Sequence, residues 1–317
     1  MKHSLRTLVA LAFACTVCTV HAGVPKDLPY PAAKPDALEI ARQVYFVNHF
    51  YSVRNVSFER KGNHKITVMA TRGKGKPLEI STLRRFLNNA YDKSQIKARD
   101  LVLFHSGNLI GSGMLVTTFT HEAKPPYYST WLPALKRVRH FSEPAHDEAW
   151  SGSDLTYGDV YLREPHHETH ELIGQQPFPD CLGSMELDER ERSNRYLEQF
   201  PGPQCAHQGK EVYQLKSTTT FRDWWYDYRI SYVDTHSFAD YRTDYYKDEK
   251  LIKRIDRDWH VMQGVEDPRG VYWRYWYALS YDDNHETMVA VPPDLVKWNR
   301  DMDNDFWSVE TMQHLRR

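Results

Sequence analysis

The sequence predicts a mainly β fold: a half-open antiparallel β-barrel, formed by one curled sheet and covered by helical lid segments. Three observations favour it. Strand-like stretches follow one another over most of the chain, aromatic residues make up 13% of it, and a single stretch has a clear helical period. Long strands with apolar faces and open edges aggregate unless the sheet closes, curls or is covered, so a curled sheet with a helical cover is expected.

The first 22 residues are typical of a cleavable secretory signal. Lys2 and Arg6 precede an apolar run over residues 8–20, and Val20-His21-Ala22 offers a cleavage site after Ala22. The run falls short of the about 20 residues that a membrane span needs, which argues against an uncleaved anchor. Residues 23–35 are Pro-rich and predict an extended arm. We therefore expect a bacterial-type periplasmic protein.

The four cysteines fall into two pairs. Cys15 and Cys18 lie in the signal, and neither follows the Leu-small-small triplet expected before a lipidated cysteine. Cys181 and Cys205 remain in the mature chain, and in an oxidising compartment they most simply form one disulfide. Closing that loop is worth about 3.5 kcal/mol in the chain-entropy model.

Charge and hydropathy narrow the class of partner. The net charge is -1, so the chain has no basic excess that would indicate binding of nucleic acid. The mean hydropathy is -0.67, and the body of the chain is therefore expected to be soluble. Contact with a membrane is expected only at its surface, and no cofactor is predicted.

The elements follow in a simple order. Asp36 can cap a helix that runs to about Tyr51, with apolar residues near one face. The expected strands cover residues 64–71, 78–87, 100–106, 109–120, 127–133, 135–141, 211–220, 225–234, 237–246, 251–259 and 271–281, and 78–87 also suits a helix. Aromatic residues share one face of two strands: Tyr226, Tyr228 and Tyr232 in one, and Trp273, Tyr275 and Tyr277 in the other.

Residues 177–209 interrupt the succession of predicted strands. They contain Pro, Gly, both cysteines of the mature chain and the charged run 186–192. We interpret the segment as an inserted loop that carries a short polar helix and is stapled by the disulfide.

Two segments resemble a family signature. Residues 131–139 read WLPALKRVR, and residues 151–159 read SGSDLTYGD. In the LolA-like outer-membrane lipoprotein-sorting proteins (LolA/LolB-like periplasmic carriers), a strand of the form WLPALKRVRR precedes a GSDFSYEDL motif. Residues 305–312 resemble the closing piece of that family. The chain is thus similar to the family over residues 36–317, as a single domain, with Leu155 and Gly158 in place of the family's Phe and Glu.

The resemblance implies a half-open barrel with a helical lid and an apolar cavity. It also implies transfer of lipid or lipoprotein between membranes, in some cases beside inner-membrane exporters of the resistance-nodulation-division type. Exposing a 16-carbon acyl chain to water costs roughly 12 kcal/mol, so a carrier must provide an apolar cavity for it. The aromatic candidates for its wall are Trp131, Tyr157, Tyr228, Trp273 and Tyr275, which can equally fill a core.

Lys136, Arg137 and Arg139 lie on a predicted strand beside Trp131. They are candidates for contact with a lipid headgroup or a partner, and the alternative is edge-strand charge that blocks aggregation. In the signature loop of Gly152, Ser153 and Asp154, no G-x-S-x-G elbow supports a nucleophile. We expect Asp154 to tie the turn by accepting hydrogen bonds from backbone amides.

The cluster 165–171, PHHETHE, is the best case for an enzyme, because its three histidines and two carboxylates are potential zinc ligands. Its spacing is not H-E-x-x-H, and no further residues complete a tetrahedral set, so we predict no metal and no catalysis. The leading hypothesis is a carrier of acyl chains toward the outer membrane. The alternatives are a non-catalytic accessory subunit of an inner-membrane exporter and a metal-dependent periplasmic hydrolase.

Overall fold

The computed structural model describes residues 23–91, 95–121, 124–187, 194–197 and 199–314, so the predicted signal peptide lies outside the described residues. The helices are α1 (Ala37–Asn48) and α2 (Val309–His314), with short helical turns η1 (Pro133–Leu135), η2 (Trp150–Gly152), η3 (Gly158–Leu162), η4 (Pro165–His167), η6 (Pro293–Leu295) and η7 (Asn304–Phe306). The strands are β1 (Asn55–Phe58), β2 (Arg60–Lys61), β3 (Lys65–Arg72), β4 (Glu79–Asn88), β5 (Ile96–Phe104), β6 (Gly113–Phe119), β7 (Tyr127–Leu132), β8 (Arg137–Phe141), β9 (Glu168–Pro177), β10 (Leu182–Glu186), β11 (Gly202–Gln204), β12 (Glu211–Thr219), β13 (Tyr228–Asp234), β14 (Asp240–Lys247), β15 (Lys250–Val261), β16 (Val271–Ser280), β17 (His285–Ala290) and β18 (Val296–Trp298).

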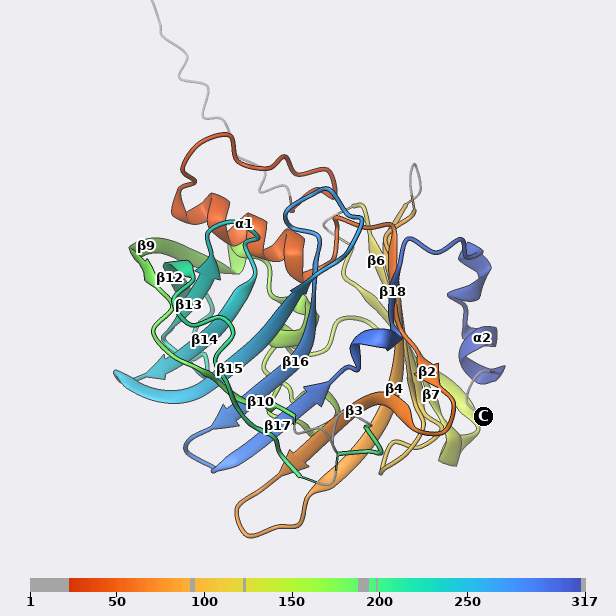
Figure 1. Ribbon diagram of the computed structural model, residues 1–317. Helices are drawn as coiled ribbons and strands as arrows, with labels where there is room; N and C mark the ends of the chain where they lie inside the picture. Colours follow the sequence, from red (N-terminus) through yellow and green to blue (C-terminus); the bar gives the residue numbers. More distant parts are fainter. Residues whose placement is uncertain (1–22, 92–94, 122–123, 188–193, 198, 315–317) are drawn as a thin grey trace, which may run out of the picture.

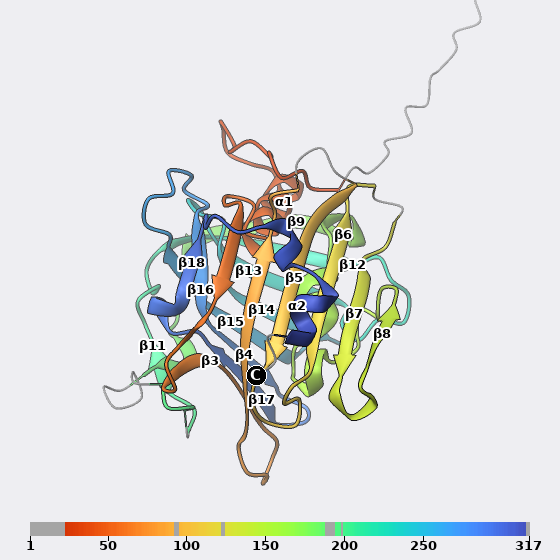
Figure 2. The ribbon, with the colours of Figure 1, turned by 90° about the vertical axis from the view of Figure 1, so that its right-hand side faces the viewer.

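One antiparallel sheet of 16 strands dominates the molecule. Its strand order is β8-β7-β6-β5-β4-β3-β17-β16-β15-β14-β13-β12-β9, with β1, β2 and β18 attached beside this path. The sheet curls on itself without closing, and its two free edges are β8 and β9 (Figures 1 and 2). The mainly β class and the half-open barrel predicted from the sequence are confirmed by this open, curled sheet. Most neighbours in the sheet are hairpin partners joined by short turns, which is typical of antiparallel strands.

Helix α1 closes one end of the curl, at the top of Figure 1. Asp36 caps it as expected, since its Oδ1 accepts a hydrogen bond from the backbone amide of Glu39 at 2.8 Å. The buried residues of the helix are Ile40, Ala41, Gln43, Phe46 and Val47, all apolar except Gln43. The Pro-rich arm packs on the helix, where Val24 and Leu28 contact Phe46.

Helix α2 lies on the opposite, convex side of the sheet, over β5, β6 and β7 (Figure 2). Trp307 is almost fully buried there, and its indole N–H donates to the Phe86 carbonyl at 2.8 Å. Met312 joins it, and the two close a small apolar cluster on the outer face of the strands. The C-terminal segment therefore braces the wall of the curl from outside.

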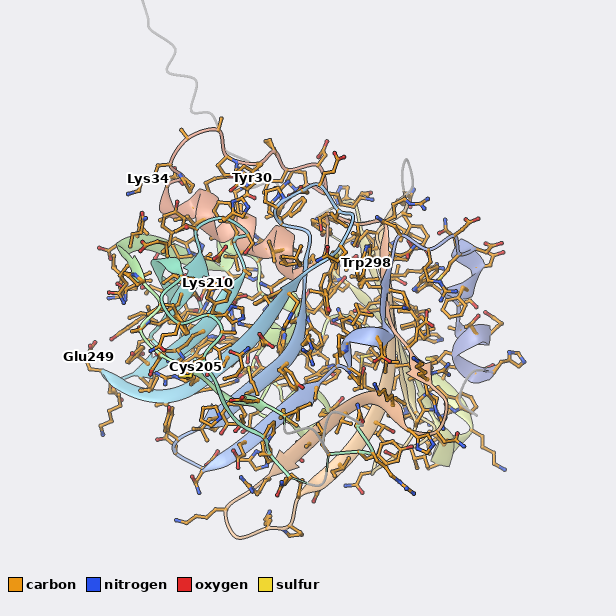
Figure 3. All side chains as sticks on the ribbon, viewed as in Figure 1. Tyr30, Lys34, Cys205, Lys210, Glu249 and Trp298 are labelled. Carbon is orange, nitrogen blue, oxygen red and sulfur yellow. A yellow bond between two sulfur atoms is a disulfide. The ribbon has the colours of Figure 1, made fainter. Side chains whose placement is uncertain are left out.

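The insertion also lies on the convex face, across β14, β15 and β16. Its strands β10 and β11 form a separate two-stranded sheet, and a disulfide joins Cys181 to Cys205 (Figure 3). Arg242 of β14 holds the insertion through a 2.8 Å hydrogen bond to the Cys181 carbonyl. The charged run was expected to be helical, but Glu186 ends β10, and residues 188–193 lie outside the described part of the chain.

The interior of the curl has two unlike halves. Apolar side chains from β1, β3 to β7, β16 and β17 line one half. Under α1, the inner faces of β9 and β12 to β15 carry buried charged and hydroxyl side chains. The segment that connects the edge strands β8 and β9 runs between these halves.

Candidate functional site

A lid fills the inside of the curl. We use this name for residues 150–163, which include η2 and η3 and belong to the connection from β8 to β9. Strands cannot close the gap between the two edges, and the lid covers the concave face instead (Figure 1). The helical cover predicted from the sequence thus comes from residues 150–163 as well as from α1.

Beneath the lid lies an apolar hollow. Its walls are side chains of the concave strands and of the lid: Phe58, Leu83, Val102, Met114, Val116, Tyr128, Trp273, Trp276 and Val289 from strands, and Trp150, Leu155, Tyr157, Val160 and Tyr161 from the lid. The Arg85–Asp100 ion pair, 2.7 Å apart, lies on its wall. With the lid closed, the hollow has a volume of about 60 Å³. Sites for drug-sized ligands begin at about 300 Å³, so the lid itself fills the space that a larger ligand would need.

Asp154 anchors one end of the lid to β16 and β17. Its carboxylate accepts hydrogen bonds from Ser280 Oγ at 2.9 Å, from Thr287 Oγ1 at 2.8 Å, and from the His285 ring at 2.5 Å. Its backbone amide donates to Thr287 Oγ1 at 3.0 Å. Asp154 therefore ties the loop by side-chain contacts across the molecule, rather than by the local backbone amides that the sequence suggested.

Asp159 anchors the other end in the charged half. Its fully buried carboxylate lies 2.6 Å from Lys253 Nζ of β15 and 2.9 Å from Arg163 Nη2, and it accepts from the Tyr245 hydroxyl at 2.6 Å. Burial opposes ionisation, but the two cations outweigh it and hold the pKa of Asp159 well below its usual range. Removing one partner of such a buried pair is costly, and the contacts with Lys253 and Tyr245 tie this end of the lid to β15 and β14.

Glu168, at the start of β9, belongs to the same charged half. It forms a bidentate pair with Arg229, with the closest contact at 2.6 Å, and it accepts from the Tyr226 hydroxyl at 2.9 Å. Burial opposes its ionisation, but Arg229 lowers its pKa to about 2. His170 contacts Ser217 Oγ at 2.9 Å and the Pro165 carbonyl at 2.8 Å. Among the described residues, no three His, Cys, Asp or Glu side chains are grouped to hold a metal.

The five aromatic candidates lie in different places. Tyr157 and Trp273 line the hollow. Tyr275 lines an outer cleft of about 470 Å³ under the insertion, and Trp131 is buried in the cluster below α2. Tyr228 stacks on Tyr246 at the edge of the charged half, with the two ring centroids 4.9 Å apart.

Side-chain alternation places Tyr228 and Trp131 on other surfaces, whereas a register shift in the pairing of β15 with β16 separates Tyr275 from Trp273, which were expected to share one face. On β13, Arg229 and Ser231 face the interior, so Tyr228 and Tyr232, which alternate with them along the strand, face outward. On β7, Trp131 faces α2, whereas Tyr128 faces the hollow. The sequence identified aromatic faces, but it did not show which face of each strand is concave.

The basic residues of the signature lie at the sheet edge. Lys136 adopts a left-handed conformation, with φ at 48°, in the turn between β7 and β8. Arg137 and Arg139 are exposed on β8, a free edge, where charge is commonly found. Gly152 has φ at +74°, which suits glycine, and the Ser153 hydroxyl donates to the Trp150 carbonyl at 2.6 Å. The signature thus shapes the start of the lid.

Sequence reasoning missed Asp159, Lys253 and Tyr161. Lys253 and Asp159 are 94 residues apart, and each looks like an ordinary charge in its own segment. A lysine on the inward face of a strand is the one available signal, because such a residue must find a partner.

A curled antiparallel sheet, a lid and an apolar hollow define a lidded half-barrel. No protein-family model matches the chain, and no curated protein matches it. The chain is similar in structure to a DUF1329 family protein from Desulfovibrio piger, with a TM-score of 0.61 and 14% identity over 88% of this chain and 100% of that one.

It is also similar to a domain from Vibrio parahaemolyticus that is named after outer-membrane lipoprotein sorting. The TM-score is 0.59 and the identity 13%, over 88% of this chain and 98% of that domain. A LolA superfamily protein from Nitrosomonas europaea matches at a TM-score of 0.47 and 10% identity. The sequence motifs predicted the fold of lipoprotein-sorting proteins, and the likeness to the Vibrio parahaemolyticus domain confirms that fold.

None of the helices in the described residues is long and apolar enough to cross a membrane.

Proposed function

We propose that this protein is a non-catalytic periplasmic carrier that shields the acyl chains of a lipid or lipoprotein during transfer toward the outer membrane. The hollow between the concave sheet and the lid is the container. Localisation in the periplasm rests on the signal-like residues 1–22.

The observation that carries the proposal is the apolar surface shared by the lid and the sheet. Trp150, Leu155 and Tyr157 of the lid cover Val102 and Val116 of the strands. An acyl chain is attracted to the same strand surface, at about 0.8 kcal/mol for each buried methylene. Cargo therefore enters by displacing the lid, and the small hollow is the closed form of a larger site.

The solved structures support the proposal through the fold. The Vibrio parahaemolyticus domain carries a name that refers to lipoprotein sorting, and the match covers most of both chains. That name concerns that domain, and we extend the idea of an acyl cargo to this chain because of the lidded hollow.

A co-purification experiment with a filled hollow tests this function. Mature protein should carry acyl lipid detectable by mass spectrometry, and Val116→Trp should lose it because Val116 lines the hollow. Val261→Trp is the control, since Val261 is 62% exposed at the end of β15. If both variants carry as much lipid as the unmodified protein, the hollow is not the container.

A further inference from the structure

We propose that the cleft at the mouth of the curl binds the phosphate-bearing headgroup of an anionic phospholipid. This inference rests on the proposed function, and it names the class of cargo. The acyl chains would pass Tyr161 into the hollow while the headgroup stays in the cleft.

The cleft is a roomy depression beside the lid. It has a volume of about 710 Å³ and lies between the N-terminal arm, α1, the start of β5, the end of β6 and the residues that follow the lid. A headgroup fits in this cleft without any rearrangement of the sheet, whereas the closed hollow, at about 60 Å³, is too small for one.

Tyr161 links the two spaces. Its side chain lines the cleft and also lines the apolar hollow, so the two spaces meet at this residue. The Tyr161 hydroxyl lies 3.4 Å from Thr118 Oγ1, and its ring is 5.2 Å from that of His49. An amphiphile bound across this ring would place its polar end in the cleft and its apolar end under the lid.

The charge of the cleft suits an anion. Lys26, Arg42, Lys97 and Lys124 line it, against the carboxylates of Glu143 and Glu164. Each carboxylate has a histidine beside it: Glu143 contacts His146, and Glu164 lies 3.2 Å from His166. Arg42 is paired with Glu39 at 3.4 Å, so three lysines face two carboxylates in the described lining, and a lipid phosphate would add the opposite charge.

Two lysines of this lining are held by backbone carbonyls. Lys97 Nζ donates to the Val24 carbonyl at 2.8 Å and lies 5.3 Å from the centre of the Tyr51 ring. Lys26 Nζ donates to the Asn89 carbonyl at 2.7 Å. Both side chains are half-buried, so the positions of their ammonium groups are restricted. Lys97 Nζ also lies 5.8 Å from the centre of the Tyr45 ring, and Tyr45 is part of the cleft wall.

The test compares lipids that share acyl chains and differ in headgroup. Binding of phosphatidylglycerol, phosphatidylcholine and diacylglycerol is measured by displacement of a fluorescent diacylglycerol. We expect phosphatidylglycerol to bind at least tenfold more tightly than diacylglycerol, because one charge-assisted contact is worth about a factor of ten. The K26Q/K97Q double variant should remove that preference and leave diacylglycerol binding unchanged.

Two controls make the result specific. K136Q/R137Q/R139Q removes more charge from the exposed β8 edge and its turn, and it should keep the preference. K26R/K97R keeps the charge in the cleft and should also keep the preference. If the β8 variant alone loses the preference, the headgroup binds at the sheet edge and the proposal is overturned.

The remaining outcomes separate this proposal from the function beneath it. Diacylglycerol binding without any preference for phosphatidylglycerol overturns the headgroup site and leaves the carrier intact. No binding of any acyl lipid overturns the carrier itself. Inorganic phosphate is tested as well. If it binds lipid-free protein at millimolar concentration and competes equally well with phosphatidylglycerol, the cleft is a site for free phosphate, and the lipid proposal is overturned.

Discussion

The Asp154→Ala variant should open the lid while the sheet stays folded. Three hydrogen bonds to the Asp154 carboxylate, from Ser280, His285 and Thr287, join the lid to β16 and β17. At about 1 kcal/mol each, their loss weakens lid closure by about 3 kcal/mol, which raises the population of the open lid about 100-fold. The change is local, because the lid has a second anchor at Asp159 and the sheet does not depend on Asp154.

Hydrogen exchange of backbone amides measures this opening directly. Protection of amides in residues 154–160 should fall by up to about 100-fold in the variant, whereas amides of β15 and β16 should keep theirs. Asp234→Ala is the matched control, because Asp234 also accepts from Ser237 and Tyr241, at 2.7 Å for each hydroxyl, but in a turn far from the lid. Equal loss of protection in lid and sheet, or no loss in the lid, would refute the reasoning.

Three further predictions concern stability. Burial opposes ionisation of Glu168, but pairing with arginine lowers its pKa from 4.5 to about 2. The ionised carboxylate therefore contributes about 3 kcal/mol to the free energy of unfolding above pH 4.5, and this contribution is lost as the pH falls toward 2. In urea unfolding, Glu168→Gln should flatten this acid dependence, and the exposed Glu171→Gln should keep it. The Cys181→Ser/Cys205→Ser variant should lose about 3.5 kcal/mol of unfolding free energy, since the disulfide spans 24 residues; an unchanged midpoint would show that the insertion is held by its other contacts. Trp307→Ala should cost about 3 to 5 kcal/mol of unfolding free energy and leave the affinity for acyl probes unchanged, and a selective loss of binding would place the C-terminal segment in the site.

Local signals were sufficient to predict most of the fold. Asp36 marked the start of α1, because a capping residue acts on amides only three positions away. Hairpins such as β5–β6 and β14–β15 were readable from alternation and turns, since both strands and their connection lie in one short segment. The family resemblance implied a helical cover for the curled sheet, and α1 and residues 150–163 provide it.

The site itself depends on long-range contacts that the sequence does not show. A strand's alternation reveals two faces without saying which is concave, so Trp131 and Tyr228 were proposed for a wall that they do not form. The anchor from Asp159 to Lys253 and the pair of Glu168 with Arg229 join segments far apart in the chain. These partners become visible only once the sheet has curled.

Photo-crosslinking tests the central claim most directly. A lipid with a photoreactive diazirine in its acyl chain is bound to the mature protein and irradiated, and the modified residues are mapped by mass spectrometry. We predict saturable labelling of the hollow's wall, in the peptides that contain Val102, Val116 and Tyr157, with weaker labelling in Val116→Trp. Labelling confined to the convex face, or labelling that does not saturate, would contradict the account.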